Sequence, residues 1–150
     1  MATYNNPKLV PAVTPLESGG LYIDRQITDL ANADFITAAV AAGDLIQIGV
    51  IGANAVMVPG IASISFPTLD ATATMKVGTL ADDDAVLASE TVTAAEVKDG
   101  DDLVLTGTVG SADEPTPIYL EVGGTVGGFA TTGKIVFDVA QRAYRSDVDG

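Results

Sequence analysis

Two β-rich runs near the C-terminus constrain the fold more than any other feature of this sequence. Residues 117–122 have the sequence PIYLEV, and residues 134–139 have the sequence KIVFDV. Every second residue in each run is apolar, so each strand has one side that must be buried against a second layer. The glycine-rich connection between the runs predicts a hairpin. The apolar residues are Ile118, Leu120, Val122, Ile135, Phe137 and Val139.

Shorter segments upstream have the same strand-like character. They cover residues 21–27, 45–51, 55–58, 62–66 and 73–77, with glycine or proline residues between most of them. Short strands that recur with such turns are typical of β-sandwiches and jelly rolls. The sequence therefore predicts an all-β fold, an antiparallel β-sandwich that resembles a jelly roll, with at most one short helix.

The alternation also predicts which side chains point inward. In 45–51 these are Ile46, Ile48 and Val50. In 21–27 the apolar residues Leu21, Ile23 and Ile27 share a face, with Arg25 as the exception. The first strand is therefore plausible but imperfectly patterned.

Residues 32–42 form the one alanine-rich window of helix length. Asn32 or Asp34 could cap a helix there, and Gly43 would end it. The window predicts a short helix or turn, and a strand over residues 35–38 is the alternative.

The first 20 residues differ from the rest of the chain. Three evenly spaced prolines and Gly19-Gly20 disfavour both a helix and a central strand. We interpret residues 1–20 as an extended arm, 21–145 as one β-sandwich domain and 146–150 as a frayed tail. The arm is either a disordered tail or a segment that orders on a partner, since it is more apolar than a solvated tail requires. Its candidate partner-binding residues are Pro7, Leu9, Val10, Pro11, Val13 and Leu16.

The acidic residues are concentrated in one region. Ten of the twenty lie between residues 82 and 114, where Lys98 is the one basic residue. The runs 82–84 and 99–102 could bind a hard cation such as Ca²⁺, but neither has the EF-hand spacing. A solvated acidic surface is the simpler interpretation, so we expect no metal.

Composition removes most other functions. The chain has no cysteine, histidine or tryptophan, which excludes a Ser-His-Asp triad, a cysteine nucleophile and thiolate or imidazole metal ligands. A net charge of −13 disfavours nucleic acid as a partner, and no apolar run is long enough for a membrane helix. The glycines at 123–128 lack the order of a phosphate-binding loop and precede a strand. Sugar binding is disfavoured by the low aromatic content. We expect no enzymatic activity and no cofactor.

The order of segments from Gly43 to Val139 resembles the small head decoration, or cement, proteins of tailed bacteriophages. The resemblance is carried by AGDLIQIG, the AVMV strand, LDATATMKVGT, PIYLEV and TGKIVFDV. It implies a β-rich homotrimer on local three-fold axes of the capsid exterior, with terminal arms that grip the major capsid protein. The family offers no catalytic residues to carry over.

The resemblance implies a virion protein that is assembled in the host cytoplasm, and the first residues lack the pattern of a secretory leader. The alternatives are a head-fibre or tail-associated virion module, or a bacterial surface or carbohydrate-binding β-sandwich. Like charges oppose self-contact through residues 82–114. We therefore expect the trimer contact at residues 45–66 and the C-terminal hairpin.

Overall fold

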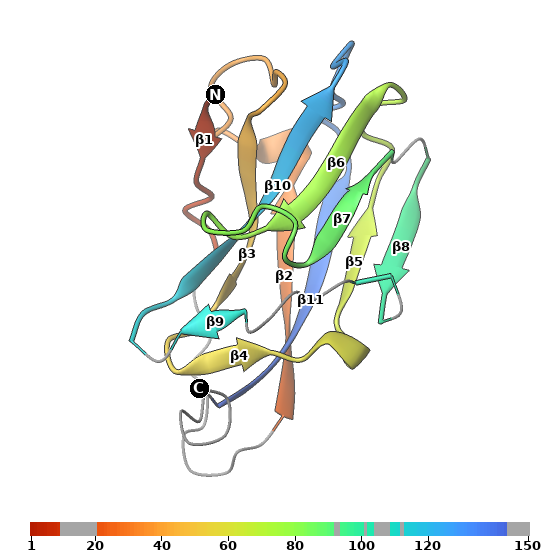
Figure 1. Cartoon of the computed structure of the whole chain (residues 1–150). Helices are drawn as coiled ribbons and strands as arrows, with labels where there is room; N and C mark the ends of the chain where they lie inside the picture. Colours follow the sequence, from red (N-terminus) through yellow and green to blue (C-terminus); the bar gives the residue numbers. More distant parts are fainter. Residues whose placement is uncertain (10–20, 92–93, 101, 104–108, 112, 144–150) are drawn as a thin grey trace.

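The computed structural model describes residues 1–9, 21–91, 94–100, 102–103, 109–111 and 113–143. These residues form two packed β-sheets, which confirms the predicted all-β sandwich (Figure 1). The strands are β1 (Thr3–Tyr4), β2 (Leu21–Asp29), β3 (Leu45–Ile51), β4 (Ala55–Met57), β5 (Ser63–Phe66), β6 (Ala73–Gly78), β7 (Leu87–Glu90), β8 (Glu96–Asp99), β9 (Gly110–Ser111), β10 (Thr116–Gly124) and β11 (Lys134–Ala143), and η1 (Leu30–Asn32) and η2 (Pro59–Ile61) are single 3-10 turns.

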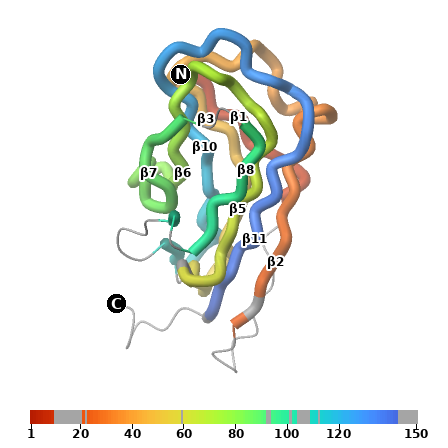
Figure 2. The backbone as a smooth tube through the Cα atoms, turned by 90° about the vertical axis from the view of Figure 1, so that its right-hand side faces the viewer, coloured from red at the N-terminus to blue at the C-terminus, as the bar shows by residue number. Residues whose placement is uncertain are grey.

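One sheet has the strand order β1-β3-β10-β6-β7. Its pairs are antiparallel, except that the short β1 lies parallel to β3. The other sheet has the order β8-β5-β11-β4-β9, and β2 runs antiparallel along the second side of β11. Figure 2 shows the two layers from the side, with β6 and β7 in one and β5, β11 and β2 in the other.

The core lies between the two layers and contains the apolar residues that alternation predicted for the C-terminal runs. Ile118, Leu120 and Val122 of β10 are fully buried, as are their counterparts in β11. Ile46 and Ile48 of β3 lie in the core as predicted, but Val50 is buried outside the core cluster, and Ile51 lies in the cluster instead. The pairing of β3 with β10 shifts register between Ile118 and Tyr119, so simple alternation does not continue to the end of the strand. Leu45, Gln47 and Ile51 complete a strand that is covered on both faces.

The hairpin predicted from residues 117–122 and 134–139 is wrong. β10 pairs with β3 and β6, whereas β11 pairs with β2, β4 and β5, so the two strands belong to opposite sheets. The connection crosses from one layer to the other. The two apolar faces consequently meet across the core and bury each other, which a flat hairpin could not do.

The alanine-rich window forms turns, one of the two structures predicted for it, and contains neither the short helix nor the alternative strand. The helical turn η1 precedes most of the window, and Asp29 caps it by accepting a hydrogen bond from the Ala31 backbone N–H at 3.1 Å. Residues 33–44 form turns and irregular backbone, and Phe35, Ile36 and Val40 pack against the core. Gly43 has φ of +88°, so the chain turns sharply before β3. No helix in the described part of the chain is long and apolar enough to cross a bilayer.

Strand β2 is present as predicted, but its apolar face points to solvent. Leu21, Ile23 and Ile27 are 52%, 54% and 45% exposed, whereas Gln26 and Thr28 are buried. The polar face turns inward because its side chains find hydrogen-bond partners between the sheets, as described below. Strand β11 also extends past the predicted run of residues 134–139 and ends at Ala143.

Candidate interaction surfaces

The N-terminal segment lies along the edge of β3. The Ala2 backbone N–H donates to Asp44 Oδ1 at 2.8 Å, and the Leu45 N–H donates to the Ala2 carbonyl at 2.8 Å. Tyr4 is buried, and the Asn6 N–H donates to Gln47 Oε1 at 3.0 Å. The first six residues are thus held on the sandwich by both backbone and side-chain contacts.

Two of the candidate arm residues, Pro7 and Leu9, belong to the described part of the chain. Pro7 is exposed, and Leu9 is half-buried with its N–H bonded to the Asn6 carbonyl. The other candidates lie outside the described residues: Val10, Pro11, Val13 and Leu16. The arm boundary at residue 20, the domain limit at residue 145 and the binding role of the arm remain predictions.

Buried amide side chains join the two sheets along one open side of the sandwich. The Val50 N–H donates to Gln26 Oε1 at 2.7 Å, and Gln26 Nε2 donates to the Val50 carbonyl at 2.8 Å. Gln141 of β11 accepts from the Gly52 N–H at 3.2 Å. Asn6 Nδ2 contacts Thr28 Oγ1 at 3.4 Å. Sequence reasoning missed these residues, although glutamines inside otherwise apolar strands are a visible signal of buried polar contacts.

The outer face of β2, β11, β5 and β8, called the β2 face below, combines apolar and small side chains. Its central row is formed by Ile27, Val136, Ser65 and Val97, which are aligned by the strand register. Val97 is 56% exposed, and Ile23 and Leu21 extend the apolar surface along β2. This row places exposed branched aliphatic side chains on a rigid sheet.

Charges on the β2 face are balanced. In the row next to Ile27, Arg25 makes a bidentate ion pair with Asp138, with N···O distances of 2.8 and 3.0 Å. This contact raises the pKa of Arg25 and lowers that of Asp138. Lys134 stands opposite Asp29 in the register. The pKa of Asp29 is lowered mainly by the hydrogen bond from Asn32, and the charge of Lys134 adds to this effect. The outward-facing charged residues of these strands are Arg25, Lys134, Arg142, Asp29, Asp99 and Asp138.

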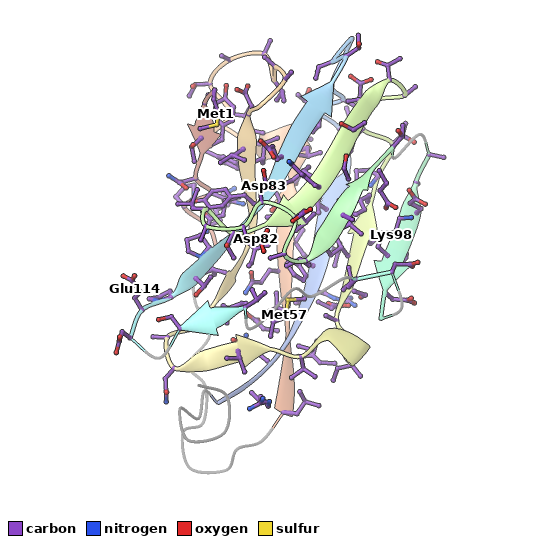
Figure 3. The ribbon with its side chains drawn as sticks, in the orientation of Figure 1. Met1, Met57, Asp82, Asp83, Lys98 and Glu114 are labelled. Atoms are coloured by element: carbon purple, nitrogen blue, oxygen red, sulfur yellow. The ribbon has the colours of Figure 1, made fainter. Side chains whose placement is uncertain are left out.

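The acidic triad of Asp82, Asp83 and Asp84 lies in the connection between β6 and β7, where Figure 3 labels its first two members. One carboxylate oxygen from each of the three residues lies within 4.8 Å of the other two. Lys76 Nζ lies 2.8 Å from Asp83 and 3.1 Å from Glu121. These contacts raise the pKa of Lys76 to about 12 and lower the pKa of Asp83, whereas the neighbouring Asp82 raises the pKa of Asp84. The protein thus supplies its own cation to this cluster.

The second acidic cluster is only partly described. Asp99 and Asp102 are exposed, and Asp101 lies outside the described residues. The Asp99 backbone N–H donates to Asp102 Oδ2 at 3.4 Å, which is a weak turn contact. These two carboxylates provide too few ligands for a calcium site on their own.

Asp70 anchors the glycine-rich connection between β10 and β11. Its carboxylate accepts hydrogen bonds from the Thr72 N–H and hydroxyl, both at 2.8 Å. It also accepts from the backbone N–H groups of Gly127 at 3.0 Å and Gly128 at 3.2 Å. These donors lower the pKa of Asp70 to about 2. The amides of Gly127 and Gly128 therefore bind the protein's own carboxylate.

A surface hollow of about 550 Å³ lies between the β6–β7 connection and the start of β10. Apolar residues such as Leu80, Ala85 and Pro115 form much of its lining. Its carboxylates are Asp82 and Glu114, which Figure 3 shows on separate segments, well apart in that view.

Comparison with known proteins shows the fold. No protein-family model and no curated protein matches this sequence. A chain in the structure of the capsid of Ralstonia phage GP4 superimposes with a TM-score of 0.65 and 23% sequence identity, over 90% of this chain and 93% of that chain. A chain in the asymmetric unit of the cyanophage Pam1 capsid has a TM-score of 0.50 and 14% identity, over 94% of this chain and 97% of that one. This protein therefore shares its fold, over nearly its whole length, with chains of two bacteriophage capsid structures.

Proposed function

We propose that this protein is a non-catalytic structural component of a bacteriophage virion, which binds the outside of the capsid and stabilises it as a decoration or cement protein. The observation that carries the proposal is the fold shared with chains of two phage capsids. Both matches cover more than nine-tenths of the other chain, so the likeness involves a whole chain in each capsid.

The finer role as a decoration protein is supported by the sequence resemblance described above. The proposed partners are the major capsid protein and further copies of this chain in a homotrimer. The proposed location is the capsid exterior, with assembly in the host cytoplasm. The chain's high negative charge opposes contact with packaged nucleic acid, which is consistent with an exterior position.

A non-catalytic role is supported by the state of the carboxylates in the described residues. Asp70 is bonded to backbone amides, Asp83 to Lys76, and Asp138 to Arg25. These contacts hold each of them as an anion, so none has the raised pKa of a general acid. Asp84 has a raised pKa, but it lies on an exposed turn among other acids.

In this proposal the N-terminal segment contacts the shell. Residues 2–6 are fixed to the sandwich, so the chain that follows Leu9 starts from a defined position at the edge of β3. An apolar segment anchored in this way loses less conformational entropy when a partner orders it than a free peptide does.

Cryo-electron microscopy of virions from the phage that carries this sequence would test the proposal. We expect density for the sandwich at many equivalent positions on the capsid exterior. Density at a few vertices or on the tail would instead indicate a head-fibre or tail-associated module. Absence from virions, together with binding on a glycan array, would favour a carbohydrate-binding surface protein.

Substitutions in the arm would test its role separately. Because residues 10–20 connect the N-terminal segment to β2, the variant keeps this connection and replaces Val10, Val13 and Leu16 by serine. We expect normal folding and weaker sedimentation with capsids that lack the protein. Unchanged capsid binding by this variant would show that the arm has no such role.

A further inference from the structure

The edges of the two sheets are not equally protected. Strands at sheet edges expose unpaired backbone groups, and proteins commonly keep such strands short or place charges on them. In the described chain β1 and β9 have two residues each, and β7 and β8 have four. The long exception is β2, a nine-residue strand that pairs with β11 in an unbroken register from Asp29 to Leu21.

Of the features that protect sheet edges, β2 has charged residues, namely Asp24, Arg25 and Asp29, but not a short length. The strand contains no proline or glycine, and no other described strand pairs with it. Its one outward-facing basic residue, Arg25, is paired with Asp138 of the neighbouring strand. An edge of this length beside exposed Ile23 and Ile27 combines open hydrogen-bonding groups with apolar surface, and both favour association.

We propose that the β2 face and the free edge of β2 form a self-contact, covered by a second copy of this chain. The inference deepens the proposed homotrimer by naming a surface through which each copy contacts the next, and it rests on that part of the proposed function. In a three-fold ring this surface of one copy meets a different surface of the next copy, because two like edges would pair only with two-fold symmetry. The face includes β11 and β5, which lie in the regions where the sequence argument expects the contact.

Charge is the reason to assign a second copy to this face. Three of the seven basic residues point outward here with three of the twenty acidic residues, although the chain as a whole carries a charge of −13. Two copies that meet elsewhere bring acidic surfaces together, at a cost in free energy. Two copies that meet here keep most of that charge apart.

The dimensions of the face suggest a contact of moderate strength. Nine residues at about 3.3 Å each span roughly 30 Å, and four strands about 4.8 Å apart span roughly 14 Å. The area is on the order of 400 to 500 Å², below the ~800 Å² per partner of a standard interface. We therefore expect association in the micromolar range, with backbone pairing along β2 adding to the apolar contact.

Sedimentation equilibrium of the double variant Ile23→Thr, Ile27→Thr tests the proposal. Threonine keeps the β-branched shape that suits a strand, so the variant should fold and show an unchanged circular dichroism spectrum. We expect oligomers of the wild type and monomers of the variant at concentrations up to about 100 µM. The matched control is Leu80→Thr, which changes an exposed apolar residue away from this face and should leave the oligomer intact.

A cysteine variant provides a second measurement, because the chain contains no cysteine. A nitroxide label on Ile27→Cys should give dipolar coupling between copies, whereas the same label on Leu80→Cys should give weaker coupling.

A monomeric wild type, or an oligomer that survives in the threonine variant, would overturn the proposal. If the threonine variant keeps its oligomeric state but no longer sediments with capsids, the face binds the shell and the self-contact is wrong. If the self-contact is found but the wild type does not bind capsids, the proposed capsid role fails and the contact stands.

Discussion

The side-chain amide of Gln26 makes two hydrogen bonds with the backbone of Val50, in the pattern that a neighbouring strand would make. The amide oxygen of Gln26 accepts from the Val50 N–H, and its amide nitrogen donates to the Val50 carbonyl, at 2.7 and 2.8 Å. This reciprocal pair connects β2 of one sheet to β3 of the other. It satisfies both backbone groups of a buried residue, which would otherwise lack partners on that side of β3.

Replacement of Gln26 should therefore destabilise the sandwich strongly. Gln26→Met keeps the approximate volume but leaves the N–H and carbonyl of Val50 unpaired, at an expected cost of about 2 to 3 kcal/mol in the free energy of unfolding. Urea denaturation would measure it. Thr131→Ala, in an exposed loop, is a control that should change little. An equal stability of the methionine variant and the wild type would show that water replaces the amide at no cost.

The exposure of the apolar face of β2 follows from the same contact. Alternation in residues 21–27 shows that Ile23 and Ile27 share one face and Gln26 and Thr28 the other, but it does not show which face is inside. The decision depends on Asn6 and Val50, which are 22 or more residues away in the chain. Sequence patterning cannot place such distant partners, so the usual assumption that the apolar face is buried gave the wrong orientation.

The predicted hairpin failed for a related reason. Alternation correctly identified Ile118 and Phe137 as core residues, because burial depends on the local pattern. Strand pairing depends on where the connection leads, and a glycine-rich connection fits either a turn or a crossing between sheets. The crossing is fixed by Asp70, whose carboxylate holds Gly127 and Gly128 from a distant loop.

The candidate sites were predictable to a similar extent: the acidic triad was found in the sequence, and its partner Lys76 was not.

Gly49 allows β3 to pack closely on β11. A Cβ atom at this position would lie 2.7 Å from Cδ2 of the Phe137 ring, which is fully buried. Gly49→Ala should therefore lower the free energy of unfolding by about 1 to 3 kcal/mol through overpacking. Gly60→Ala is the matched control, since its added methyl would meet no atom within 4 Å. Thermal unfolding of both variants would show whether only Gly49→Ala is destabilised. Equal melting temperatures would mean that Phe137 moves aside easily.

Asp70 should make stability depend on pH in the acid range. Its pKa is about 2 in the folded protein against an ordinary value of 3.8, so the folded state favours the ionised form. The stabilisation is complete above the ordinary value and is lost as the pH falls through about 2. Asp70→Asn should lower the melting temperature by several degrees at pH 6, and its difference from the wild type should shrink towards pH 2. A difference that stays constant over this range would show that the carboxylate charge has no role in holding the glycine loop.

Because Lys76 contacts the acidic triad, we expect the triad not to bind calcium specifically. Its ammonium already lies 2.8 Å from Asp83 and 3.1 Å from Glu121, and a divalent cation would have to compete with that charge. We expect Ca²⁺ to raise the melting temperature of the wild type no more than sodium chloride does at equal ionic strength. Lys76→Met should cost about 0.5 to 1 kcal/mol at low salt, because it leaves the carboxylates to repel one another, and less in 1 M salt, where the repulsion is screened. Calcium should stabilise this variant more than sodium chloride does, since the ammonium group that contacts Asp83 is then absent. A calcium-specific rise in the wild type would contradict the assignment of Lys76 as the resident cation and would restore the triad as a metal site.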